Sequence, residues 1–332
     1  MGQYAPMKAI LISAPFSDPN WLFERKLDGV RAGVVVNQGA VRLLSRSGHT
    51  MNATYPELVE TIEADPVHDL IADGEIVAFE HGQTSFARLQ RRIQIHDPER
   101  ARRSGVAVYL YLFDLLEFDG DDLRSAPLRE RKQRLRGAFR FRDRLRWTPY
   151  RVGAGETAFR HACAHGWEGV IAKRADSPYA PARSRDWRKI KCSRGQELVI
   201  GGWTAGRGAR RRLGALLLGY WEQGRLRYAG KVGTGFDRSE IDRLADELEC
   251  RERSSPPFAD ERLPRSARWA EPELVAQIAF TEWTEDGRLR HPRYLGLRED
   301  KPAREVVRES PADEGKPADV RPGAAPAPVR SR

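Results

Sequence analysis

The sequence predicts an α+β domain followed by a small antiparallel β-barrel. Through about residues 1–194, short apolar strands alternate with segments of helical periodicity. From about Gly195 onward the segments are strands rich in glycine and aromatic residues, with one helix among them. After about Val307 the composition becomes polar and rich in proline. We therefore predict domains over residues 1–194 and 195–307 and a disordered tail over residues 308–332.

The first domain is expected to combine antiparallel sheets with short helices. Residues 29–48 contain two β-branched strands around an Asn-Gln-Gly turn, which predicts a hairpin. Apolar residues recur at helical spacing in other segments, and apolar runs bounded by turn residues predict further strands. The expected helices are residues 55–66, 84–93, 128–139 and 155–166, and the expected strands are residues 70–79, 106–120 and 167–174.

The second region has the strand inventory of an oligonucleotide-binding (OB) barrel. Five or so strands with one inserted helix are typical of this small barrel. Its tryptophans, Trp203, Trp221 and Trp283, are expected in the core rather than stacked on bases, because barrel strands normally bury such rings. The expected elements are strands at residues 197–206 and 274–284, a hairpin at residues 213–233 and a helix at residues 238–250.

Bulk composition favours a basic protein of a reducing compartment with a polyanionic partner such as nucleic acid. Lys and Arg number 57 against 47 Asp and Glu, which gives a formal net charge of +10 and a sequence pI of about 9.7. The three cysteines are far apart in sequence and form no C-x-x-C pair. No signal peptide precedes the first strand, and no apolar run approaches the roughly 18 residues that cross a bilayer. We expect a cytoplasmic protein without membrane contact.

Residues 23–36, FERKLDGVRAGVVV, place Lys26 between an acid and an Asp-Gly turn at the edge of a strand. For an isolated K-x-D-G, solvated surface charges are the commonest explanation. Phosphate binding by Lys26 and Arg31 as point charges is a second explanation. The third is nucleophilic catalysis, which requires a neutral lysine although the ordinary lysine pKa is about 10.4. A pocket and nearby positive charge, such as a metal ion, would have to lower that pKa.

Charged clusters recur at the ends of apolar strands along the chain. Each cluster alone is compatible with a solvated strand end. Their joint pattern indicates that side chains from different strands converge on one cleft, which suits a ligand with both phosphate and metal. The clusters are SRSG at 45–48, DGE at 73–75, FDLL at 113–116, EGVIAKR at 168–174, WRKIK at 187–191 and REDK at 298–301.

In this order, the clusters and K-x-D-G-x-R at residues 26–31 resemble the covalent nucleotidyltransferases: DNA ligases, RNA ligases and mRNA capping enzymes. The segments WLFERKLDGVRA, AGKVGTGF and HPRYLGLREDKPAREV are most similar to the ATP-dependent DNA ligases of bacterial end-joining systems. The resemblance covers about residues 6–307. It implies an adenylation domain of antiparallel sheets followed by an OB-fold domain, with ATP as cofactor and nicked or broken duplex DNA as substrate.

The resemblance also implies a mechanism for Lys26. Lys26 would attack the α-phosphate of ATP, release pyrophosphate and hold AMP as a lysyl phosphoramidate. AMP would pass to the 5′-phosphate of DNA, and the 3′-hydroxyl would displace it. Glu24 shares a strand face with Lys26 and can accept a hydrogen bond from the adenine amine. Phe113 matches a ring that stacks on the base.

Other matching residues are expected around the phosphates and a metal ion. Glu75 and Glu168 match metal-proximal carboxylates, whose hard oxygens suit Mg²⁺ or Mn²⁺. Lys189 and Lys191 alternate along one strand face, so both can point at the α-phosphate. The remaining expectations are ribose and phosphate contacts by Arg31, Arg46 and Glu75, turn and charge stabilisation by Asp28, and leaving-group orientation by Arg298, Asp300 and Lys301 after closure of the barrel.

Two further patterns carry less information. The basic, glycine-broken loop at residues 205–214 suits a DNA backbone, although a solvated loop explains its charge equally well. His161, Cys163 and His165 resemble a metal cluster, but no fourth ligand is near in sequence and the segment is expected to be helical. We therefore do not expect a zinc site there.

The chain departs from many end-joining ligases, which are often fused to polymerase and phosphoesterase modules, and from larger DNA ligases with an N-terminal DNA-binding domain. We interpret it as a minimal two-domain core, monomeric and associated with the bacterial nucleoid, that works at broken ends with a partner such as the bacterial Ku ring. The alternatives are an RNA ligase or capping-type nucleotidyltransferase and a non-catalytic DNA-binding protein. An NAD-dependent ligase is disfavoured because the zinc-finger cysteines of that class are absent.

Overall fold

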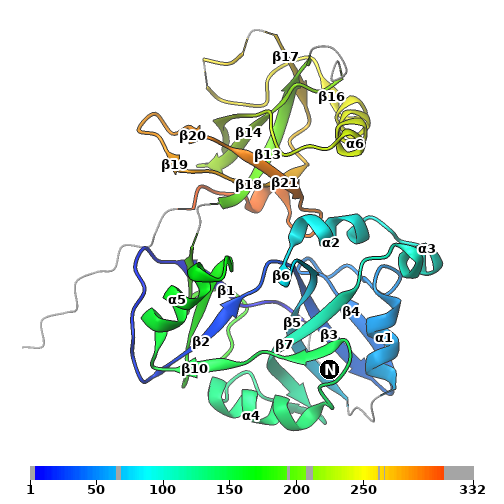
Figure 1. Ribbon diagram of the computed structural model, residues 1–332, viewed down its shortest axis with the longest axis vertical. Helices are drawn as coiled ribbons and strands as arrows, with labels where there is room; N and C mark the ends of the chain where they lie inside the picture. Colours follow the sequence, from blue (N-terminus) through cyan, green and yellow to red (C-terminus); the bar gives the residue numbers. More distant parts are fainter. Residues whose placement is uncertain are drawn as a thin grey trace, which may run out of the picture.

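The computed structural model describes residues 4–64, 69–192, 195–206, 212–260, 262–264 and 266–309. Two sheets and their helices form the larger part of the molecule, and the remaining strands form a smaller barrel above them (Figure 1). Within these described residues, no helix is long and apolar enough to span a membrane.

The first sheet of the larger part has five strands in the order β1-β12-β11-β2-β10. Only the β1–β12 pair is parallel. Helix α5 covers one face, where Ala162 packs with Trp21, Phe23 and Val170 of the strands. The other face lies toward the second sheet, where Trp187 packs with Phe113, and it also contacts helix α4 (Leu128–Ala138), where Leu22 packs with Leu128. The elements are β1 (Lys8–Leu11), β2 (Trp21–Lys26), β10 (Tyr150–Val152), α5 (Gly155–Ala164), β11 (Gly169–Arg174) and β12 (Arg183–Lys191).

The second sheet follows the order β4-β3-β5-β7-β8, with β6 and β9 as side branches. Its outer face carries the largest apolar core of this part, in which the helices α1, α2 and α4 bury residues such as Leu58, Leu89 and Leu135. The elements are β3 (Val30–Asn37), β4 (Ala40–Leu44), α1 (Pro56–Glu63), β5 (Leu70–Glu80), β6 (Gln83–Thr84), α2 (Phe86–Ile93), α3 (Pro98–Arg103), β7 (Val108–Phe118), β8 (Asp121–Asp122), α4 (Leu128–Ala138) and β9 (Leu145–Trp147).

The barrel is built on β13, which pairs with β14, β17 and β18, while β21 pairs with β18. Trp203 is fully buried, and Trp221 and Trp283 are partly buried against the same core, so the predicted core placement is confirmed. The elements are β13 (Gly195–Thr204), β14 (Ala215–Glu222), β15 (Arg225–Val232), α6 (Arg238–Glu249), β16 (Glu252–Arg253), β17 (Ala267–Ala270), β18 (Val275–Ala279), β19 (Glu282–Trp283), β20 (Leu289–Arg290), β21 (Arg293–Leu297) and a 3-10 turn (Ala303–Glu305).

Two local predictions differ from the structure. The strand expected over residues 274–284 is divided, because the chain stops pairing with β13 and β21 at Ala279 and begins a separate hairpin with β20 at Glu282. Helix α3 was not predicted. It has only six residues and buries only Ala101, so it has almost no apolar periodicity, and it begins where the Asp97 side chain accepts from the Arg100 amide.

The cysteine prediction and the tail boundary also need correction. Cys163 of α5 and Cys192, directly after β12, form a disulfide across 29 residues of sequence because both segments border β11. The two cysteines are therefore adjacent in space although they are far apart in sequence. The predicted tail begins two residues too early, since Arg308 lies over the Trp283 ring and Glu309 binds buried lysines. The rest of that tail, residues 310–332, lies outside the described residues.

Candidate active site

Three neighbouring strands place the predicted lysines on one face of the first sheet. In the register of β2, β11 and β12, Gly169 lies between Lys26 and Lys191, and Ile171 lies between Glu24 and Lys189. Directly paired residues project to the same side of a sheet, so these four polar side chains share a face. Gly169 has a positive φ of 149°, and an added Cβ would lie 2.0 Å from the Ile190 carbonyl oxygen. The glycine therefore permits the close approach of strands between the two lysines.

Lys26 ends β2 and is only 18% exposed. Its ammonium group forms an ion pair with Glu168, which precedes β11. Asp28 follows in the turn, where its carboxylate accepts a hydrogen bond of 3.1 Å from the Phe86 amide at the start of α2. Burial, and then repulsion from Glu168, raises the pKa of Asp28 to about 6. The Asp28 carboxylate thus connects the turn after Lys26 to the first residue of α2.

Glu24 lies deeper on the same face, between two buried lysines. Its Oε1 is 2.6 Å from the Nζ of Lys132 on α4, and its Oε2 is 2.7 Å from the Nζ of Lys173 on β11. Burial alone would raise the pKa of Glu24, but the ammonium groups of Lys132 and then Lys173 outweigh burial and lower it. Burial in turn lowers the pKa of Lys173 to about 8. The acceptor expected to bind adenine is therefore held as a carboxylate.

Phe113 comes from the second sheet at an irregularity of β7. Asp73 pairs with Asp114 and Gly74 pairs with Leu112, so Phe113 is the extra residue of a β-bulge. A bulge re-aims its side chain, and the Phe113 ring points into the space between the sheets. Lys173 Nζ lies 3.9 Å from the ring centroid.

Arg31 lines the cavity and is held there by several partners. Its Nε and Nη2 bind both carboxylate oxygens of Asp73 at 2.6 and 2.5 Å. The hydroxyls of Tyr4 and Tyr179 donate to the same carboxylate at 2.9 and 2.6 Å. The guanidinium lies over the Phe113 ring at 4.7 Å. In this structure Arg31 supports the pocket wall.

Lys189 and Lys191 point toward one carboxylate that the sequence did not indicate. Glu309 Oε1 is 2.5 Å from Lys189 Nζ, and Glu309 Oε2 is 3.0 Å from Lys191 Nζ. Burial, and then Lys191, lowers the pKa of Lys189 to about 8. Burial opposes the charge on Lys191 as well, but Glu309 raises its pKa. Both lysines offer the positive charge that a phosphate group would need.

Glu75, on β5, lines the cavity beside Lys26 and has no hydrogen-bond or ion-pair partner within the described part of the chain. Burial raises its pKa to about 7. Glu168 lines the adjoining cavity, which Glu75 shares. No group of three or more His, Cys, Asp or Glu side chains among the described residues is arranged around a metal site. Mg²⁺ usually binds one or two carboxylates together with substrate phosphates, so Glu75 and Glu168 fit such an ion.

The barrel closes over this cavity and contributes the last motif. Arg298 binds Asp300 through two hydrogen bonds of 2.8 Å and donates to the Gly29 carbonyl of the turn after Lys26 at 3.2 Å. Lys301 Nζ is 2.9 Å from the Glu197 carboxylate of β13. The chain then continues to Glu305, whose carboxylate is 2.7 Å from Lys8 Nζ and 3.5 Å from Arg46.

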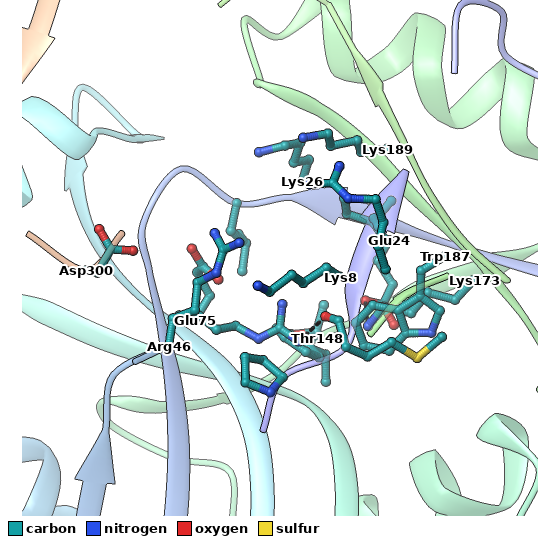
Figure 2. A pocket seen from close by; sticks show the side chains of 18 of the residues that line it. Lys8, Glu24, Lys26, Arg46, Glu75, Thr148, Lys173, Trp187, Lys189 and Asp300 are labelled. Atoms are coloured by element: carbon teal, nitrogen blue, oxygen red, sulfur yellow. Dashed lines mark hydrogen bonds and ion pairs between the residues drawn. The ribbon is translucent and has the colours of Figure 1, made fainter. Parts of the chain in front are cut away.

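The structure brings all the predicted site residues to this one region. Lys26 and Lys189 lie at one end, Glu24, Lys173 and Trp187 lie together on one side, and Glu75, Arg46 and Asp300 lie on the other (Figure 2). The predicted residues that line the main cavity are Glu24, Lys26, Arg31, Arg46, Glu75, Phe113, Lys189, Arg298, Asp300 and Lys301. Asp28, Glu168 and Lys191 line the adjoining cavity.

Several residues of the site were not predicted as such. Lys173 and Trp187 lie within quoted clusters, on the face of Lys26, and period-two alternation could have found them. Lys132, Glu197 and Glu309 had no sequence signal, because each contacts a residue more than 100 positions away.

Among the residues that the structure describes, neither of the two weaker patterns lines the main or the adjoining cavity. Arg212, from the basic loop, binds Asp246 and Glu249 of α6, and residues 207–211 lie outside the described residues. His161 and His165 stack on each other with ring centroids 4.0 Å apart, and Cys163 between them is bonded to Cys192.

The cavity has a lysine at its rim, a buried carboxylate at one end, a lysine pair at the other and a barrel that closes over it. This arrangement is that of a two-domain nucleotidyltransferase. Family models agree and are more specific: the ATP dependent DNA ligase domain matches residues 6–191, and the ATP dependent DNA ligase C terminal region matches residues 209–301. The chain belongs to the ATP-dependent DNA ligase family.

Several similar proteins are named as bacterial end-joining proteins. The multifunctional non-homologous end joining protein LigD of Pseudomonas aeruginosa is 38% identical over 317 residues, 93% of this chain and 37% of that protein. The LigD of Mycobacterium tuberculosis is 40% identical over 296 residues, 87% of this chain and 37% of that protein. This chain thus spans little more than a third of these relatives. A solved mycobacterial DNA ligase D, complexed with ATP and MES, is 37% identical with a TM-score of 0.65 over 92% of this chain and 98% of that one.

Proposed function

We propose that this chain seals nicked or broken duplex DNA with ATP, through a lysyl-AMP intermediate on Lys26, during end joining. The observation that carries the proposal is the shared strand face, on which Glu24 and Lys26 of β2 lie opposite the lysine pair of β12 across β11. Membership of the ATP-dependent DNA ligase family supports ATP as the nucleotide and DNA as the substrate.

In the first step, the neutral amine of Lys26 attacks the α-phosphorus of ATP. A phosphorus–nitrogen bond forms and the bond to the bridging oxygen breaks, so that pyrophosphate leaves with the electron pair of that bond and the nitrogen gives one proton to water. The ion pair with Glu168 requires the ammonium form, so Glu168 must release Lys26 before the attack. Lys189 and Lys191 stabilise the charge on the phosphoryl oxygens. Glu24 and Phe113 hold the base.

We propose that Glu75 and Glu168 hold Mg²⁺ together with the nucleotide phosphates. The ion would offset phosphate charge while Lys26 approaches. Arg298 and Lys301 orient the leaving pyrophosphate from the barrel side, because the closed arrangement brings them to the cavity.

In the later steps, the 5′-phosphate of DNA attacks the phosphoramidate and takes up AMP, which frees Lys26. The 3′-hydroxyl then attacks the 5′-phosphorus, the new phosphodiester forms and AMP leaves. DNA needs access to Lys26, so the barrel must reopen after the first step. We propose the two domains of residues 1–194 and 195–307 as the moving bodies and a Ku-type ring as the partner at broken ends.

The test is transfer of label from α-³²P ATP to the protein, followed on a denaturing gel. We expect a labelled band that disappears in Lys26→Ala, remains in Lys231→Ala, an exposed lysine of the barrel, and is discharged by nicked DNA. Label from GTP in place of ATP would move the protein to the capping class. No label from either nucleotide would contradict covalent catalysis.

A further inference from the structure

We propose that Lys132 of helix α4 is a positioning residue that sets the preference of the nucleotide site for adenine. The inference rests on the proposed function, in which Glu24 accepts the hydrogen bond of the base. Lys132 lies outside every motif that the sequence analysis singled out, and it reaches the base through its neighbours.

One ammonium group joins the two elements that would recognise the base. Lys132 Nζ donates to Glu24 Oε1 at 2.6 Å and to the Phe113 carbonyl oxygen at 3.1 Å. Glu24 belongs to the first sheet, and Phe113 is the bulge residue of the second. Both line the cavity, whereas Lys132 is not among the described residues that do. Lys132 therefore sets the distance between the acceptor and the stacking ring without touching the ligand.

Helix α4 is held so that this ammonium group has little freedom. Leu128, Arg131, Lys132 and Leu135 form its buried face. The guanidinium of Arg131 binds both carboxylate oxygens of Asp114 at 2.7 and 2.9 Å, and both side chains are fully buried. This bidentate pair anchors the helix to β7 one residue after Phe113. The Lys132 side chain is only 1% exposed.

The aromatic rings around Lys132 strengthen its ion pair with Glu24. Its Nζ lies 5.4 Å from the Trp147 ring centroid and 5.1 Å from the Tyr150 ring centroid. Aromatic faces attract a cation and exclude water, so the ion pair with Glu24 is little screened.

The base preference follows from the chemistry of the purines. Adenine presents an amine donor at position 6, where guanine presents a carbonyl acceptor. An ionised Glu24 can only accept, so it binds adenine and repels guanine. The charged groups that face Glu24 are Lys132 from α4 and Lys173 from β11, and Asp114 from β7 lies behind them. Without Lys132, Glu24 would be less firmly ionised and could turn or donate a proton to the guanine carbonyl.

The experiment compares adenylation with ATP and guanylylation with GTP in Lys132→Met, which keeps the length of the side chain and removes its charge. We expect KM for ATP to rise roughly tenfold or more, since hydrogen bonds to charged groups contribute more than neutral ones, with a smaller change in kcat. The ratio of ATP to GTP labelling should fall, and fall further as pH is lowered from about 8 to about 6, where a weakened Glu24 gains a proton. Arg134→Met, an exposed residue on the same helix, should leave all these values unchanged.

A double variant separates positioning from simple loss of structure. If Lys132 acts through Glu24, Lys132→Met should change the nucleotide ratio little in a Glu24→Gln background. If the methionine variant does not fold, Lys132→Gln serves, since its amide can still donate one hydrogen bond without charge. This inference would be overturned if a folded Lys132 variant kept the KM for ATP and the ratio of ATP to GTP labelling. It would also be overturned if Lys132→Met had equal effects with Glu24 and with Glu24→Gln. Neither outcome would contradict the proposed function. Absence of label in the unaltered protein would overturn the proposed function with it.

Discussion

The two ends of the nucleotide cavity are built from the same kinds of residue but in opposite ways. At the base end, Glu24 is enclosed by Lys132 and Lys173, and all three side chains are at most 3% exposed. These residues come from strands and a helix of one domain. At the phosphate end, Lys189 and Lys191 are paired with Glu309, which arrives from the far end of the barrel.

The difference indicates which contacts a ligand must replace. The base end keeps its ion pairs when a base enters, because Glu24 has lone pairs to spare for an amine. At the phosphate end, the carboxylate of Glu309 occupies the donors that a phosphate would use, so nucleotide binding requires an exchange of anions. The base end is preorganised, and the phosphate end is satisfied internally until the nucleotide arrives.

The largest effect should come from removing the charge of Glu24 at the base end. Glu24→Gln leaves Lys132 and Lys173 buried without their counter-charge, and removing one partner of a buried ion pair costs about 3–5 kcal/mol. We expect a fall of this size in the free energy of unfolding, measured in urea, together with weak labelling by ATP. The control is Glu222→Gln, an exposed residue of β14. Unaltered stability would show that the lysines are not held by Glu24.

At the phosphate end we expect a smaller effect, in which ATP binds more tightly rather than more weakly. Glu309→Gln removes the internal competitor from Lys189 and Lys191, so KM for ATP should fall roughly three- to tenfold while kcat stays similar. Steady-state labelling at several ATP concentrations measures this change. Glu285→Gln, an exposed residue of the β19–β20 turn, is the matched control. A rise in KM would instead mean that Glu309 organises the lysines for the nucleotide.

The smallest expected effect is the dependence of KM for ATP on pH. Because burial lowers the pKa of Lys189 to about 8, this side chain is charged below that pH and loses its proton above it. KM for ATP should therefore rise several-fold between about pH 7.5 and 9, and Lys189→Arg should reduce this dependence because arginine stays charged. The ratio of ATP to GTP should change less in that range, since the pKa of Glu24 is lowered and Glu24 also pairs with Lys132, although burial lowers the pKa of its other partner, Lys173, to about 8. If the ratio of ATP to GTP labelling changed with pH in parallel with KM, the two ends would not behave differently.

Sequence reasoning recovered the strand that carries Lys26 because its cause is local. Period-two alternation places Glu24 and Lys26 on one face of β2, and the same rule places Lys189 and Lys191 on one face of β12. It also recovered helices α1, α2, α4 and α5 and the barrel hairpin, where apolar periodicity and turn residues agree.

Other features of the site could not be found in this way. The bulge that turns Phe113 inward depends on the register between β5 and β7, which neighbouring residues do not specify. The partner of Arg31, Asp73, lies 42 positions away on β5, and no local pattern indicates this pair. Cys163 and Cys192 meet only because β11 runs between their segments.

The sequence by itself determined which residues could carry nucleotidyl transfer and which strand faces they occupy, because side-chain direction along a strand is fixed by the backbone. Only the tertiary structure decided which charges neutralise one another. Lys132 meets Glu24 across 108 positions, and Lys189 meets Glu309 across 120. Coulomb interactions depend on distance in space and on burial, neither of which follows from position in the chain.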